Sequence, residues 1–74
     1  MKYIHFSRHA KNRMRWRKIT EHQVKETILS AELIVDSFGN RKAAYKHVGD
    51  RYIKVIFVEE YNKIIVITAI DKTR

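Results

Sequence analysis

The residues best suited to chemistry lie in one short basic stretch, residues 7–18, near the start of the chain. His9, Arg13 and Arg17 recur there at every fourth position, which places them on one stripe of a helix. A histidine titrates near neutral pH and can transfer protons, and an arginine guanidinium can hold phosphate oxygens with a planar pair of donors. The stripe therefore predicts a site that binds a phosphate and moves a proton beside it. The alternative is that the arginines form a solvated helix flank and that His9 is a polar residue at the edge of the core.

Positive charge is concentrated around this stretch. Residues 1–20 carry seven Lys or Arg and no acid, whereas the remaining 54 residues carry nine Lys or Arg against eight Asp or Glu. A net charge of +8 predicts an anionic partner, and nucleic acid is the commonest class. Aromatic side chains could stack on unpaired bases, although the two tyrosines could equally be packing residues of a strand surface. Besides the stripe, the predicted RNA-binding residues are Arg8, Lys11, Arg15, Trp16, Lys18, Tyr45 and Tyr52.

Residues of these types can cleave RNA without a metal ion. The 2′-hydroxyl of RNA is a built-in nucleophile, so the protein needs only to move protons and to stabilise the pentacovalent phosphate. We expect His9 to act as general acid or base and Arg13 and Arg17 to stabilise the phosphate. Lys54 could add charge or, with a lowered pKa, act as the base. The alternative for Lys54 is a solvated lysine on a strand.

Other kinds of site are not indicated. The chain has no Cys, so it has neither a disulfide nor a thiolate ligand. Its four His are scattered, its eight acids are dispersed, and two Gly do not make a glycine-rich phosphate loop. We expect no metal and no other cofactor.

The pattern of the chain predicts one α+β domain over residues 1–74. Ser7 is placed to cap a first helix, and Thr20 with Gln23 fits a capping box for a second. Helices followed by strands indicate two N-terminal helices packed on a curved four-stranded antiparallel sheet, with a short N-terminal edge strand as an addition. The predicted elements are the edge strand 2–6, the helices 8–17 and 21–31, and the strands 33–36, 41–48, 51–59 and 64–70.

The hairpin loop Gly49–Asp50 fixes which side chains share a face of the sheet. Side chains alternate along strands, so one face should pack against the helices. That face carries Ala44, Lys46, Val48, Ile53, Val55, Phe57, Ile64, Val66, Thr68 and Ile70. The opposite face carries Tyr45, His47, Tyr52, Lys54, Ile56, Val58, Ile65 and Ile67. Because much of the opposite face is apolar, we expect a cover for it: the N-terminal strand, a second copy of the chain in a homodimer, or a protein partner.

The location is predicted from what the sequence lacks. Its first residues do not contain the long apolar region of a secretion signal. No apolar run approaches the roughly 20 residues that a membrane span needs. We expect a cytoplasmic protein that does not bind membranes.

The run H-A-x-x-R-M-x-x-R-x-I-[ST] from His9 to Thr20 resembles the signature of a family of small bacterial proteins of unknown function. A helix and strands ending in Ile-Val-Ile-Thr at 65–68 follow it, so the resemblance covers nearly the whole chain. That family is similar to the RelE/ParE-type toxins, in the broader group that includes barnase and colicin-type RNases. The resemblance implies a toxin domain with metal-independent ribonuclease activity on RNA, ribosome-associated mRNA included, and an antitoxin partner. By position it implies catalytic roles for His9, Arg13, Arg17, Lys54 and Thr68.

The chain departs from that pattern at its C-terminal end. RelE-type enzymes tend to carry an aromatic residue there, whereas no aromatic residue follows Tyr61 in this sequence. ParE-type members share the fold without ribonuclease chemistry and act on a protein target. The alternative function is therefore a non-catalytic module of the RelE/ParE fold that binds a protein or a nucleic acid.

Overall fold

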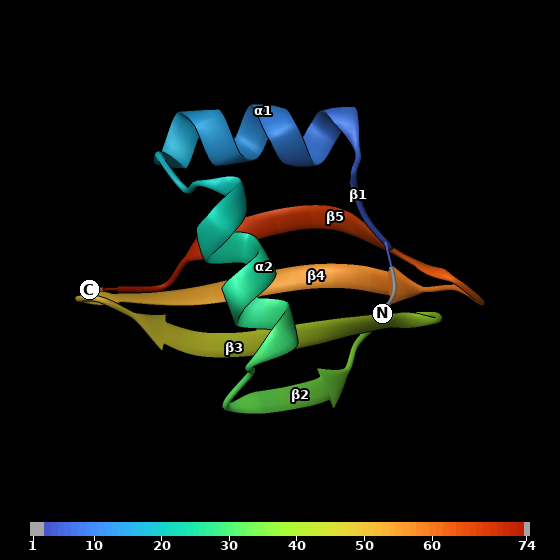
Figure 1. The fold of residues 1–74 in the computed structure, drawn as a ribbon. Helices are drawn as coiled ribbons and strands as arrows, with labels where there is room; N and C mark the ends of the chain where they lie inside the picture. The colour runs from blue at the N-terminus through green and yellow to red at the C-terminus, as the bar shows by residue number, and fades with distance from the viewer. Residues whose placement is uncertain (1–2, 74) are drawn as a thin grey trace.

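The computed structural model describes residues 3–73 and has an α+β fold, with two helices and a five-stranded sheet (Figure 1). Both predicted helices are confirmed, although the second ends two residues earlier than expected. Position 2, the predicted start of the first strand, lies outside the described residues. The elements are β1 Tyr3–Phe6, α1 Arg8–Arg17, α2 Glu21–Leu29, β2 Leu33–Asp36, β3 Arg41–Val48, β4 Arg51–Glu59 and β5 Lys63–Asp71.

The sheet is mixed and has the strand order β1-β5-β4-β3-β2. Strands β2 to β5 pair antiparallel with their neighbours in the chain, while β1 pairs parallel to β5 with Phe6 opposite Val66. The predicted N-terminal edge strand is present as β1, and its parallel pairing with β5 makes the sheet mixed and five-stranded instead of an antiparallel sheet of four strands. Pairing with β5 gives partners to the backbone groups of β1 and turns Phe6 into the core, where it is buried.

The register of the β3–β4 hairpin is confirmed, with Tyr45 opposite Lys54. Gly49 in its loop has φ +65°, in the left-handed region that glycine adopts without a steric penalty. The register shifts between β4 and β5, because Ile56 lies opposite Thr68 but Phe57 lies opposite Val66.

This shift corrects the face prediction for the last strand. Ile67 is the extra residue of the bulge, and one extra residue reverses the alternation that follows it. Ala69 therefore lies on the core face, where it is fully buried. Thr68 and Ile70, predicted on the core face, lie on the opposite face.

Both helices pack on one face of the sheet. Figure 1 shows α2 crossing in front of β3 and β4 while α1 lies along β5. The opposite face has no helix over it in the part of the chain that the structure describes, and β1 extends the sheet at one edge instead of covering this face. The shared core contains Phe6, Ala10, Met14, Ile19, Val24, Ile28, Ala44, Ile53, Val55, Phe57, Ile64, Val66 and Ala69.

Candidate RNA-binding and catalytic site

Helix α1 is defined by local interactions at both of its ends. The Ser7 side chain accepts a hydrogen bond from the backbone N–H of Ala10 at 3.0 Å, which caps the first turn. Lys18 ends the helix in the left-handed conformation, and the N–H of Ile19 donates to the carbonyl of Met14 at 2.9 Å. Ala10 and Met14 are buried against the sheet, so they fix which side of α1 faces solvent.

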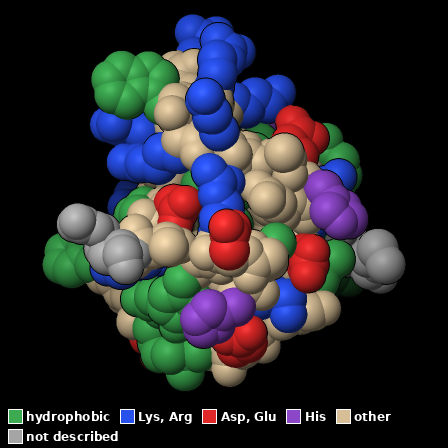
Figure 2. Space-filling model, turned by 90° about the vertical axis from the view of Figure 1, so that its left-hand side faces the viewer, with side chains coloured by type: hydrophobic (Ala, Val, Ile, Leu, Met, Phe, Trp, Pro, Cys, Tyr) green, Lys and Arg blue, Asp and Glu red, His purple; other side chains and the backbone are tan. Residues whose placement is uncertain are grey.

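The solvent side of α1 is a continuous cationic surface. Figure 2 shows Lys and Arg side chains gathered at the top of the view, over α1, with acidic side chains below them. The first turn contains no acid and holds Arg8, although the helix dipole favours negative charge at that end. Helix stability therefore does not account for Arg8, whereas Arg15 lies in the last turn, where the dipole favours a cation. The members of the cationic surface, all exposed, are Arg8, His9, Lys11, Asn12, Arg13, Arg15, Trp16 and Lys18.

His9 and Arg13 are in contact on this surface. The Nε–H of Arg13 donates a long hydrogen bond of 3.4 Å to Nε2 of His9. In this contact Nε2 of His9 is the acceptor. A phosphate that draws the guanidinium away would leave Nε2 able to take a proton.

The same two residues line a pocket on the outer side of the helix. The pocket has a volume of about 220 Å³ and is completed by Asn12 and Trp16. All four side chains come from α1 itself, at spacings that place them on one strip of its surface. Asn12 was not predicted as a site residue, and its position four residues before Trp16 is the signal that could have identified it.

Arg17 is turned toward the sheet. One of its terminal guanidinium nitrogens, Nη1, donates to the carbonyl oxygen of Ala69 on β5 at 3.0 Å, and the residue is half-buried. This contact docks the end of α1 on β5. Arg17 therefore lies on the predicted stripe of α1, but one of its N–H donors is occupied by the Ala69 carbonyl.

The remaining predicted residues lie on the face of the sheet away from the helices. Tyr45 and Tyr52 stack there with ring centroids 5.8 Å apart, and the Lys54 ammonium lies 5.6 Å from the centre of the Tyr45 ring. Thr68 is on this face as well because of the bulge. The structure thus separates these four residues from His9 and Arg13 by the thickness of the sheet.

No metal-binding cluster is found among residues 3–73: no three His, Cys, Asp or Glu side chains gather there as ligands would. None of the helices in this range has the length and apolar character that a membrane crossing requires.

Comparison with known proteins places the chain in a family. A family model described as "Domain of unknown function (DUF4258)" matches residues 6–71, which include both helices and the strands β2 to β5. The chain belongs to the DUF4258 family. No curated protein and no solved structure matches it. The matched region of this DUF4258 domain contains the whole motif from His9 to Thr20.

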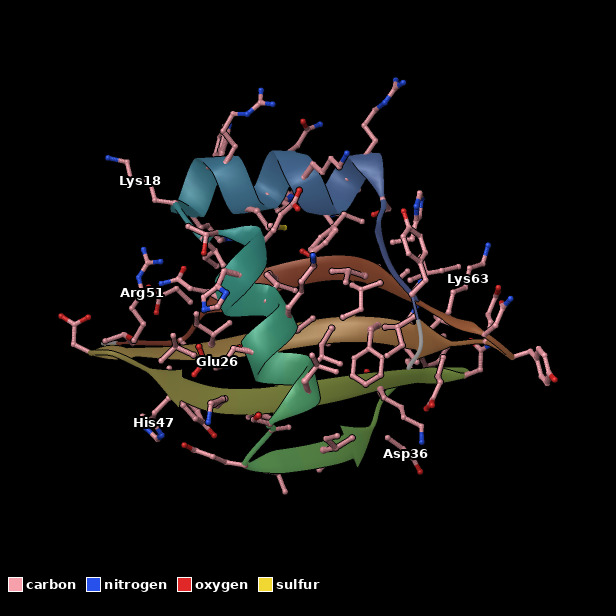
Figure 3. The ribbon with its side chains drawn as sticks, in the orientation of Figure 1. Lys18, Glu26, Asp36, His47, Arg51 and Lys63 are labelled. Atoms are coloured by element: carbon pink, nitrogen blue, oxygen red, sulfur yellow. The ribbon has the colours of Figure 1, made fainter. Side chains whose placement is uncertain are left out.

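Arg51, at the start of β4, holds the end of α1 in this DUF4258 domain. Figure 3 shows Arg51 below Lys18 at this end of the helix. The Arg51 guanidinium donates to the carbonyl oxygens of Lys18 at 2.7 Å and Arg17 at 2.9 Å, and it pairs with the Asp71 carboxylate at 3.1 Å. Carbonyls at a helix C-terminus lack partners within the helix, and a cation there also matches the helix dipole. No pattern close to Arg51 in the sequence indicates this role, because Arg17 and Lys18 are more than thirty residues away and Asp71 is twenty residues away.

The charge of Asp71 should make stability depend on pH. Hydrogen bonds from Thr73 lower the pKa of the Asp71 carboxyl, and the Arg51 guanidinium lowers it further. A carboxyl with a lowered pKa in the folded state adds stability above its pKa in the unfolded chain, and this stability is lost as pH falls through the folded-state value. The loss is therefore expected below about pH 4.

We expect Asp71→Asn to reduce the free energy of unfolding at pH 7 by about 0.5 kcal/mol and to flatten its dependence on pH below about 4. Urea unfolding at a series of pH values measures both effects. Asp50→Asn, in the exposed β3–β4 loop, is the control because it removes the same charge. Equal pH profiles for Asp71→Asn and the unsubstituted protein would contradict the assignment.

Proposed function

We propose that this DUF4258 domain binds RNA through the cationic surface of α1 and cleaves it without a metal ion. The observation that carries this proposal is the contact between His9 and Arg13 in a pocket on that surface. A proton-transferring group and a phosphate-binding group are thereby adjacent, and neighbouring cations can hold the RNA backbone.

The reaction is an internal transesterification of RNA. The phosphate binds Arg13, whose guanidinium leaves His9, and Nε2 of His9 then takes the proton of the 2′-hydroxyl. The 2′-oxygen attacks phosphorus, and Arg13 stabilises the negative charge of the pentacovalent phosphate. The bond from phosphorus to the 5′-oxygen breaks, and the 5′-oxygen takes a proton from water. The products are a 2′,3′-cyclic phosphate and a 5′-hydroxyl, and His9 returns its proton to solvent.

The fold lends support to the resemblance to RelE/ParE-type toxins. Two N-terminal helices cover one face of the antiparallel strands β2 to β5, as that resemblance implies. In this proposal ribosome-associated mRNA is among the substrates, and an acidic antitoxin would bind the basic chain. The mechanism assigns no step to Lys54 or Thr68, which lie on the other face of the sheet.

A non-catalytic binding module is the second candidate. The observation in its favour is the separation of Lys54 and Thr68 from His9, because it leaves a single proton-transferring side chain in the pocket. Such a module would bind RNA or a protein target through the same cations. Its affinity for RNA would fall steeply with salt without any cleavage.

The deciding experiment is incubation of the purified protein with labelled RNA and with DNA of the same sequence, in EDTA. We expect cleavage of the RNA alone, with 2′,3′-cyclic phosphate ends, because only RNA carries the internal nucleophile. Translating ribosomes are included as a second substrate. Intact RNA under both conditions, together with salt-sensitive binding, would reject the nuclease and favour the binding module.

A further inference from the structure

Trp16 is the most unusual residue of α1. It is the only tryptophan of the chain, and 84% of its surface is exposed. Tryptophan is usually well buried, because its large ring gains free energy by leaving water. Trp16 adds little to the core in this position, so its indole face remains available to a ligand.

The groups around the indole suit one nucleotide. The pocket that Trp16 lines with His9, Asn12 and Arg13 measures about 220 Å³, which is below the usual range of about 300–1,000 Å³ for sites that enclose larger ligands. The indole offers a flat face on which a base can stack. The Asn12 side chain has an NH2 donor and a carbonyl acceptor for the edge of a base, and the planar Arg13 guanidinium can donate two hydrogen bonds to a phosphate.

We infer that this pocket is a subsite for a single unpaired nucleotide, with its base stacked on Trp16, its edge facing Asn12 and its phosphate on Arg13. The inference rests on the proposed function, because it assumes that the polyanion is RNA, and it adds that the bound segment is single-stranded. In a duplex the bases are stacked on one another and paired, so none of them can cover the indole. The base on Trp16 would hold the adjoining phosphate beside His9.

Fluorescence of the single tryptophan tests the stacking directly. Short 2′-O-methyl RNA strands are the probe, because they lack the attacking hydroxyl and stay intact during a titration. We expect saturable quenching of the emission by single strands, and little quenching by duplex RNA or by heparin, which supplies negative charge without bases. Vesicles of phosphatidylserine and phosphatidylcholine form another arm, because a membrane-binding helix would shift the emission to the blue instead.

Affinity for the same labelled strands is measured by fluorescence anisotropy. Trp16→Leu should weaken binding by about 10-fold, since stacking on an aromatic ring contributes that order of affinity for each base. Tyr61→Leu is the matched control: Tyr61 is 95% exposed but lies in the β4–β5 turn, away from α1. It should change the affinity less than 2-fold. Both substitutions are at exposed positions, so the fold should persist.

The outcomes separate the subsite from the proposed function. Binding of single strands without quenching, and with equal affinity for Trp16→Leu, would overturn the subsite and leave RNA binding in place. A blue shift with vesicles and no response to RNA would overturn both. If no RNA strand bound, both the subsite and the proposed function would be overturned.

Discussion

Substitution of His9 by alanine is expected to lower the rate of RNA cleavage by about 10²–10⁴-fold, the usual contribution of a general acid or base. The affinity for uncleavable RNA should change little, because the Lys and Arg side chains of the cationic surface of α1 are all retained. The fold should be unaffected, since His9 is exposed and lies outside the core. Single-turnover cleavage of labelled RNA measures the rate, and anisotropy with 2′-O-methyl RNA measures the affinity.

Two matched variants make this result specific. His22→Ala removes another exposed histidine, from α2, and should cleave RNA like the unsubstituted protein. Arg13→Lys keeps the charge beside His9 but loses the planar fork, so it should cleave more slowly while it binds RNA nearly as well. Cleavage by His9→Ala at the original rate would show that the proton is moved by another group and would remove the basis of the proposed mechanism.

Local signals in the sequence predicted the elements of the fold. Ser7 and the Thr20–Gln23 capping box define where the helices begin, and both sets of hydrogen bonds are present. The two-residue loop at Gly49 predicted the register of the β3–β4 hairpin, which the structure confirms. Each of these features depends on residues only a few positions apart.

Features that depend on distant residues could not be predicted in this way. The bulge at Ile67 reversed the faces of Thr68 and Ile70, and no turn residue marks it in the sequence. The pairing of β1 with β5 joins the two ends of the chain, and it decides that the sheet is mixed.

In the candidate site, too, local spacing was predictable and the placement of distant residues was not. The stripe on α1 was predicted from helical spacing, and it is present as the contact of His9 with Arg13. Lys54 was added to the site for the charge or the base that it could supply, and the family resemblance supported it, although the hairpin register already placed it on the face away from the helices. A resemblance transfers positions along the chain, whereas a catalytic site requires side chains on the same side of the sheet.

Arg51→Ala is expected to give the largest loss of stability, about 1–2 kcal/mol in the free energy of unfolding, because its contacts are only partly buried. The substitution leaves the carbonyls of Arg17 and Lys18 without their donor and the Asp71 carboxylate without its cation. Small domains have little stability in reserve, so unfolding should be measured in urea at low temperature, by circular dichroism. Arg51→Lys retains the charge but lacks the planar group that reaches three acceptors. Its free energy of unfolding should therefore lie between those of Arg51→Ala and the unsubstituted protein.

A comparison with Arg15→Ala separates the structural cations from those that bind RNA. Arg15 is exposed on α1, so its loss should change stability by less than about 0.5 kcal/mol but weaken RNA binding and its salt dependence. Arg51→Ala should have the opposite effect, with RNA affinity retained wherever the variant is folded. If both variants lost RNA affinity equally, the cationic surface would not be confined to α1, and the positive charge of the whole chain would be the better explanation of binding.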